Sequence, residues 1–174
     1  MQAVIDFLKQ NEKRSIAELC DYVRFPSVSA QPKHRDDLKR CAEWVAEQCK
    51  AIGLKARVCP TAGNPVVLAK TPPANSARHR PHFLVYGHYD VQPPEPFELW
   101  KSPPFEPRIE GHSIFARGAC DNKGQNLAHL KAIEAYIKTG TELPCDITFV
   151  IEGEEEVGSR SLESFLKANR DELR

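Results

Sequence analysis

Residues that can act as acids, bases or metal ligands gather directly after hydrophobic segments of this sequence. His88 and Asp90 follow the run HFLVYG, and Asp121 follows the short segment Ile114–Arg117. The glutamates at positions 154–156 follow the run DITFVIEG. Ligands of open parallel sheets bind outside the carboxyl ends of the strands, so we expect the three groups to meet in one crevice.

These residue types are those of a hydrolytic metal site. His88, Asp121 and one of the glutamates supply an imidazole nitrogen and carboxylate oxygens, which together form a ligand set for zinc. Asp121 has two oxygens and can bridge two cations about 3.5–4 Å apart. Of Glu155 and Glu156, one can bind metal while the other takes a proton from water. Asp90 is two residues after His88 and can hold the imidazole nitrogen that does not bind metal.

The distribution of charge also favours a bound cation. The segment 139–159 contains no lysine or arginine, but it contains the acidic residues Glu142, Asp146, Glu152, Glu154, Glu155 and Glu156. Consecutive carboxylates repel one another unless water or a cation screens them. Of the three consecutive glutamates, Glu154 is predicted to face solvent. Over the whole chain, 24 basic residues balance 24 acidic ones, which argues against binding to nucleic acid or to an anionic membrane.

A cysteine nucleophile is the alternative chemistry at this site. Cys120 adjoins Asp121, and His88 is a candidate base for its thiol. A small buried cysteine is the favoured interpretation, because Lys123 is the only positive neighbour that would lower the pKa of the thiol. The sequence contains no Gly-x-Ser-x-Gly elbow and no His-Glu-x-x-His motif, so two other hydrolase patterns are excluded.

The other cysteines and the N-terminal segment indicate in which cellular compartment the protein is expected. The sequence has no Cys-x-x-Cys motif, and Cys41 and Cys49 share the apolar stripe of a predicted helix. Residues 1–10 have neither the basic region nor the cleavage site of a signal peptide. No apolar run approaches the ~20 residues that a membrane helix requires. We therefore predict a cytoplasmic protein with reduced thiols.

Helices and strands alternate in a way that indicates an α/β fold with a largely parallel sheet. Apolar residues at helical spacing predict helices at 16–24, 34–52, 122–138 and 161–174, with Asp121 or Asn122 capping the third. Strands are predicted at 54–59, 65–70, 82–87 and 146–151, and a hairpin at 108–116. The apolar run His82–Gly87 is typical of a strand buried on both faces. The proline-rich segment 93–107 is predicted to be an irregular, stiff loop.

Three stretches of this sequence resemble the signature segments of one family of dinuclear zinc exopeptidases. They are YGHYDVQP (Tyr86–Pro93), ARGACDNKG (Ala116–Gly124) and EGEEEVGS (Glu152–Ser159). The family contains carnosinase-like dipeptidases, aminoacylases, glutamate carboxypeptidases, and acetylornithine and succinyl-diaminopimelate deacylases. The order and spacing of the stretches are also similar, and the segment PFELWKSPPFEP resembles the dipeptidase branch.

The resemblance implies a role for each residue of the site. His88 would bind one metal, Asp121 would bridge two, and Glu156 would bind the other. Glu155 would be the general base, and Asp90 would orient His88. The metals would be two Zn²⁺ ions, with Mn²⁺ or Co²⁺ as alternatives. The family also implies a cis peptide between Asp121 and residue 122, which is asparagine here where the family usually has aspartate.

The same resemblance implies a three-layer zinc-exopeptidase-like sheet flanked by helices. Residues 1–174 would be the N-terminal portion of the catalytic domain, and its C-terminal part, the lid and dimerisation domain and the remaining metal ligands would be absent. The ligand set of this chain would therefore be incomplete. We also expect an exposed sheet edge or apolar face that self-association into a homo-oligomer can cover.

Three functions remain open from the sequence. The first is metal-dependent hydrolysis of a peptide or amide bond in a dipeptide, as part of a longer enzyme. The second is a catalytically silent fragment or metal-binding remnant. The third is deacylation of an N-acyl-amino acid. The expected partner is a small peptide or acyl-amino-acid substrate, with no nucleic acid and no membrane.

Overall fold

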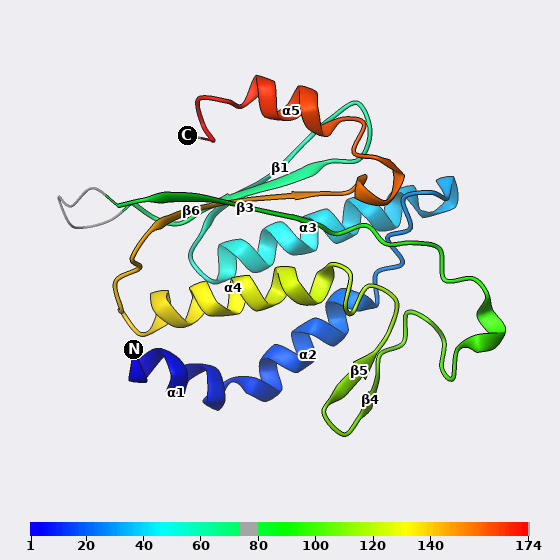
Figure 1. Cartoon of the computed structure of the whole chain (residues 1–174), viewed down its shortest axis with the longest axis horizontal. Helices are drawn as coiled ribbons and strands as arrows, with labels where there is room; N and C mark the ends of the chain where they lie inside the picture. The colour runs from blue at the N-terminus through cyan, green and yellow to red at the C-terminus, as the bar shows by residue number, and fades with distance from the viewer. Residues whose placement is uncertain (74–79, 174) are drawn as a thin grey trace.

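A four-stranded mixed sheet forms the middle layer of the structure, a computed structural model that describes residues 1–73 and 80–173 (Figure 1). The strands lie in the order β1-β2-β6-β3 and comprise β1 (Lys55–Cys59), β2 (Val66–Lys70), β6 (Asp146–Glu152) and β3 (His82–His88). The expectation of a largely parallel sheet is wrong, because only β3 and β6 are parallel. A short turn joins β1 to β2, and a short turn permits only antiparallel pairing.

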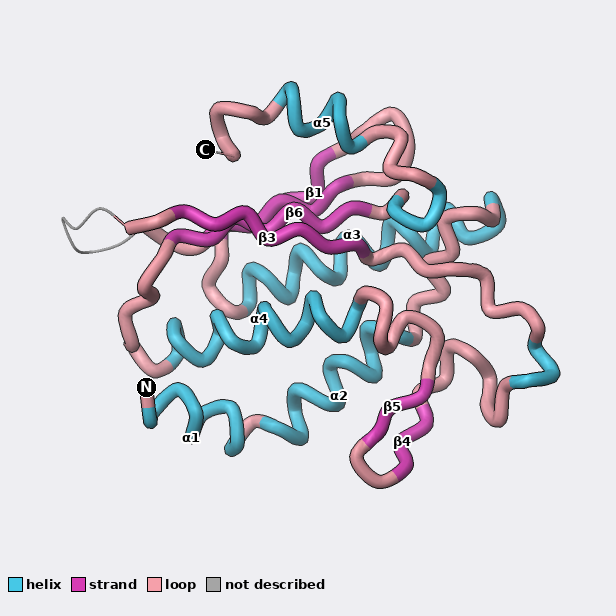
Figure 2. The backbone as a smooth tube through the Cα atoms, in the orientation of Figure 1, coloured by secondary structure: helices cyan, strands magenta, loops and turns pink. Residues whose placement is uncertain are grey.

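Helices cover both faces of the sheet, as expected for a layered α/β fold (Figures 1 and 2). One face carries α3 (Arg35–Ala51) and α4 (Lys123–Lys138), and the other face carries α5 (Leu162–Ala168). On the side of α4 away from the sheet lie α1 (Gln2–Gln10) and α2 (Glu12–Val23). Helix α1 was not predicted from the sequence, and α5 ends earlier than the predicted helix 161–174.

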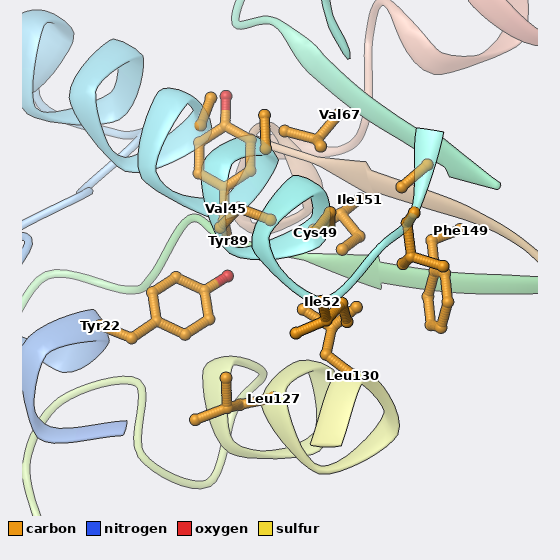
Figure 3. Packing of buried hydrophobic residues seen from close by; sticks show 14 of the residues in the cluster. Tyr22, Val45, Cys49, Ile52, Val67, Tyr89, Leu127, Leu130, Phe149 and Ile151 are labelled. Carbon is orange, nitrogen blue, oxygen red and sulfur yellow. The ribbon is translucent and has the colours of Figure 1, made fainter. Parts of the chain in front are cut away.

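The main core lies between the sheet and helices α3 and α4 (Figure 3). Cys41 and Cys49 are fully buried on the inner face of α3, as expected from their shared apolar stripe. Phe149 of β6 and Leu130 of α4 belong to the same cluster. Burial of apolar surface stabilises the folded chain by about 25 cal/mol per Å². This layer therefore holds α4 against the sheet.

Strand β3 is the last strand of the sheet, and its apolar side chains are only partly covered. Phe83, Leu84 and Tyr86 are 55%, 47% and 48% exposed, so the prediction of burial on both faces is wrong. The reason is that β3 pairs on one side with β6, while α5 packs against the other strands of the sheet. The expected exposed edge is therefore present. The strand HFLVYGH also carries no lysine, acidic residue or proline, the residues that commonly protect an edge.

We expect this edge to drive concentration-dependent self-association. Leu84→Lys places a charge on the exposed face of β3 and should shift the chain toward monomer, since edge lysines oppose strand pairing. Light scattering coupled to size exclusion over a range of concentrations measures the effect. Ile109→Lys is the control, because Ile109 is also exposed (53%) but lies in a hairpin away from the sheet. A wild-type chain that stays monomeric at high concentration contradicts the expectation.

A separate hairpin and a proline-rich loop precede α4. The hairpin pairs β4 (Arg108–Glu110) with β5 (Ser113–Phe115), as predicted. The loop 93–107 contains one short 3₁₀ turn, η2 (Phe97–Leu99), and is otherwise irregular, as predicted. The Trp100 indole donates a hydrogen bond to the Pro94 carbonyl (2.7 Å), which anchors the loop. In the described part of the chain, no helix combines the length and the apolar character needed to span a membrane.

The buried carboxylate of Glu134, which forms ion pairs with α2 and within α4, gives the stability of the chain a pH dependence. Burial opposes the charged form of Glu134, but hydrogen bonds from Lys131 (2.9 Å) and ion pairing with Arg14 (2.9 Å) outweigh it and hold the Glu134 pKa below its ordinary value of 4.5. The stabilisation is therefore complete above about pH 4.5 and is lost as the pH falls through the lower folded pKa.

Glu134→Gln should accordingly lower the free energy of unfolding by about 1–3 kcal/mol at pH 7 and by less at acid pH. Urea unfolding at pH 7 and at pH 3.5 measures the difference. The control is Glu163→Gln, on an exposed i,i+4 pair with Lys167, which should change stability little at either pH. An equal loss at both pH values for Glu134→Gln contradicts the assignment.

Candidate metal centre

His88 ends β3 and is buried, and helix α4 holds its backbone in place. The Asn126 side chain donates to the His88 carbonyl (2.8 Å), and the His88 N–H donates to the Asn122 side-chain oxygen (3.3 Å). Gly87 makes this approach possible, because a Cβ there would lie 2.0 Å from Asn126 Oδ1. The start of α4 and the end of β3 therefore meet at one place, on the same side of the molecule (Figure 1).

The His88 imidazole lies between carboxylates on both of its nitrogens. Nδ1 is 3.1 Å from the Asp90 carbonyl and 3.4 Å from Asp90 Oδ1. Nε2 is 3.0 Å from Asp121 Oδ1 and 3.9 Å from Glu155 Oε2. Burial lowers the pKa of His88, but the hydrogen bond and charge of Asp90 outweigh burial and raise the pKa to about 9. The site thus attracts positive charge, and a metal ion would compete with the proton for Nε2.

Asp90 joins His88 to the two glutamates. It is fully buried, and its carboxylate accepts hydrogen bonds from the backbone N–H groups of Glu155 (3.2 Å) and Glu156 (3.1 Å). These glutamates begin the short 3₁₀ turn η3 (Glu155–Val157) after β6. The contact of Asp90 with His88 was predicted, but its contact with this turn was not, because β3 and β6 become neighbours only in the folded sheet.

Asp121 reaches the site from the turn that precedes α4. The expected cis peptide between Asp121 and Asn122 is present. Asn122 occupies the N-cap position of α4, which is one of the two residues expected there, but its side chain makes no capping hydrogen bond to the helix. Its oxygen accepts the His88 N–H instead. The strand before Asp121 also belongs to the separate hairpin, so α4 rather than the main sheet brings Asp121 to His88. In the same solvent-facing turn Cys120 is exposed, not buried as predicted.

The three consecutive glutamates divide between two environments. The ligand atoms of His88, Glu155 and Glu156 all lie within 4.8 Å of one another. Gln92 was not predicted as a site residue although it lies in the first motif, and its side chain donates a hydrogen bond to Glu156 Oε2 (2.7 Å). Glu154 turns away from the site, and the prediction that it faces solvent is wrong.

Glu154 is 8% exposed and accepts hydrogen bonds from the backbone N–H groups of Asn64 (3.2 Å) and Ser161 (2.9 Å). It therefore joins the β1–β2 turn to the start of α5. A glutamate in this position satisfies two backbone donors that would otherwise lose water on folding. Its role is structural, which leaves Glu155 and Glu156 for the site.

The donors that meet at this point fit a divalent transition metal. Carboxylates from two separate segments lie near His88 Nε2, Asp121 at 3.0 Å and Glu155 at 3.9 Å, and the side chains of Asp121 and Glu155 are 74% and 43% exposed to solvent. This donor set suits Zn²⁺, Mn²⁺ or Co²⁺. Asp90, hydrogen-bonded behind His88, is the supporting carboxylate that metal-binding histidines commonly have. Donor sets of this kind also occur in hydrolytic metal sites.

Comparison with known proteins identifies the family. Residues 84–173, more than half of the chain, match the model of the family described as "Peptidase family M20/M25/M40". The chain belongs to this peptidase family.

Relatives with known names agree with this assignment. The Cys-Gly metallodipeptidase DUG1 of Candida albicans is 31% identical over 95% of this chain and 37% of its own length. The Beta-Ala-His dipeptidase of Homo sapiens is 30% identical over 98% of this chain and 36% of its own length. The crystal structure of human carnosine dipeptidase 1 superposes with a TM-score of 0.88 at 28% identity, over 99% of this chain and 38% of that chain.

A family metallo-carboxypeptidase, Sso-CP2 from Sulfolobus solfataricus, is 36% identical with a TM-score of 0.82, over 92% of this chain and 35% of that chain. The chain therefore has the mixed α/β fold of one part of M20 peptidase structures. This confirms the expected layered zinc-exopeptidase-like fold. The chain spans little more than a third of the length of these relatives.

Proposed function

We propose that the chain contributes one part of a metal centre that hydrolyses the peptide bond of dipeptides, within a longer enzyme. The observation that carries the proposal is that the His88 imidazole, at the end of β3, contacts Asp121 and forms a candidate ligand group with Glu155 and Glu156. The names of the relatives, which are Cys-Gly and Beta-Ala-His dipeptidases, support a small peptide as substrate.

Each residue has a role that its position supports. His88 and Glu156 would hold two divalent ions, and the exposed Asp121 carboxylate would bridge them. When bound, the ions would polarise the substrate carbonyl and make a water molecule more acidic. Glu155 is exposed and within 3.9 Å of His88 Nε2, so it can accept a proton from water and pass it to the leaving amine. Asp90 would hold the orientation of His88 through Nδ1, which leaves Nε2 free to bind a metal ion.

The alternative is a catalytically silent chain that retains at most one weak metal site. Its support is that the chain spans about 37% of its dipeptidase relatives, so ligands and substrate contacts from the remaining length would be missing. Losing substrate contacts costs rate because the reacting groups are no longer held in position.

Hydrolysis of Cys-Gly, of β-Ala-His and of acetylated amino acids by the purified chain tests the proposal, with Zn²⁺, Mn²⁺ or Co²⁺ added. Metal-dependent cleavage of the dipeptides supports the hydrolytic proposal, and preference for the acetylated amino acids favours the deacylase. Bound metal without turnover favours the silent alternative. Glu155→Gln is the matched variant, because it should retain metal but lose turnover.

A further inference from the structure

Lys123, the first residue of α4, is fully buried two residues after Asp121. Its ammonium donates hydrogen bonds to the backbone carbonyls of Phe25 (2.7 Å) and Tyr22 (3.2 Å). The ammonium also lies 5.3 Å from the centre of the Tyr22 ring. Both hydrogen-bond acceptors are therefore backbone carbonyls at the end of α2, not carboxylates.

Burying an ammonium is costly unless its surroundings replace water. Here the carbonyl end of α2 supplies the negative pole of the helix dipole, and the Tyr22 ring supplies a π face. Burial nevertheless lowers the pKa of Lys123. An apolar side chain of similar length, such as methionine, would fill the same space without this cost. The ammonium therefore points to a role for its hydrogen bonds to the end of α2.

Hydrogen bonds link the end of α2 both to the turn that carries Asp121 and to the chain that follows His88. The Lys123 N–H donates to the Gly118 carbonyl (3.1 Å), which closes the turn that carries Asp121. Gly118 has a φ of +84°, and a Cβ there would lie 2.7 Å from Val91 and 3.3 Å from the Lys123 stem. The segment after α2 also binds the chain that follows His88, because Ser27 Oγ donates to the Tyr89 carbonyl (2.7 Å).

We propose that Lys123 is a positioning residue whose buried ammonium fastens the Asp121 turn to the end of α2 and so holds the Asp121 carboxylate against His88. The same segment, Phe25–Ser27, holds the backbone beyond β3, so both partners of the His88–Asp121 contact share one support. The consequence for metal affinity rests on the proposed function, whereas the effect on the His88–Asp121 contact does not.

The test compares Lys123→Met with Lys131→Met in the full chain. Lys131 is a matched control, because it is buried two turns further along α4 and binds the carboxylates of Glu134 (2.9 Å) and Glu18. The first readout is the imidazole NMR signal of His88 in the presence of a chelator. The second is Mn²⁺ affinity by equilibrium dialysis. Lys123→Met should shift the His88 ring signals and weaken Mn²⁺ binding about tenfold, while Lys131→Met should leave both unchanged.

Each outcome decides the proposal. Unchanged His88 signals in folded Lys123→Met overturn it, and so does an equal shift in Lys131→Met, which would show a general loss of stability. If Lys123→Met does not fold, Lys123→Gln replaces it, since its amide keeps a donor for one carbonyl and should give a smaller shift. If the wild-type chain binds no Mn²⁺, the proposed function fails, and the His88 signal alone decides the role of Lys123.

Discussion

Replacing Asp121 and Glu156 together by alanine is expected to abolish metal binding by the chain. The two carboxylates reach the site from different segments, the turn before α4 and the turn after β6. Without them, His88 and Glu155 remain as donors, and two donors hold a divalent ion poorly. Removing residues that merely support metal ligands costs about 10–100-fold in affinity, so loss of two ligands should exceed about 100-fold. Equilibrium dialysis with Zn²⁺ followed by elemental analysis measures this loss.

The control for that experiment removes the same charge elsewhere. Asp36 and Glu163 have side chains that are 92% and 80% exposed and lie on other helices. Their double replacement by alanine should leave Zn²⁺ affinity unchanged, which separates ligand loss from a change in net charge. Zn²⁺ binding that survives in the Asp121 and Glu156 double variant would show that the site has been assigned to the wrong residues.

Asp90→Ala is expected to have the second large effect, on both stability and metal affinity. The fully buried carboxylate accepts two backbone N–H groups and lies beside His88 Nδ1. An unsatisfied buried donor costs about 1–3 kcal/mol, so the free energy of unfolding should fall by about 2–5 kcal/mol. Metal affinity should fall about 10–100-fold, because His88 and the η3 turn lose their common support.

Urea unfolding in the presence of a chelator measures the stability of Asp90→Ala without a contribution from bound metal. Asp90→Asn should lose less, since its amide oxygen still accepts one N–H group. Asp37→Ala is the matched control: Asp37 also contacts a histidine, with its carboxylate 2.8 Å from His34 Nδ1, but it lies at the start of α3. An Asp90→Ala variant as stable as wild type, or one that keeps full metal affinity, would contradict the central role given to Asp90.

Much of the local structure could be predicted from residue spacing. The helix α3 was predicted within a residue or two because Cys41, Val45 and Cys49 recur on one face, a pattern that depends on near neighbours alone. The prolines of the loop 93–107 and the hairpin after it were equally visible, since turn residues act over a few positions.

The parts that could not be predicted depend on contacts between distant segments. The apolar run of β3 was predicted to be buried on both faces, yet apolar composition does not say whether a strand has one neighbour or two. Glu154 was predicted to face solvent, but its donors come from Asn64 and Ser161. The buried position of Lys123 has no sequence signal at all, because its partners lie about 100 residues earlier in the chain.

The sequence by itself determined the residue types that meet at the site and the family whose motifs they form. It did so because the motifs are short and their spacing is written in the chain. Only the tertiary structure decided that Asp90 supports both His88 and the glutamates, that α4 brings in Asp121, and that Glu154 takes no part. The physical reason is that hydrogen bonding and burial join segments whose separation in the sequence carries no information about their contact in space.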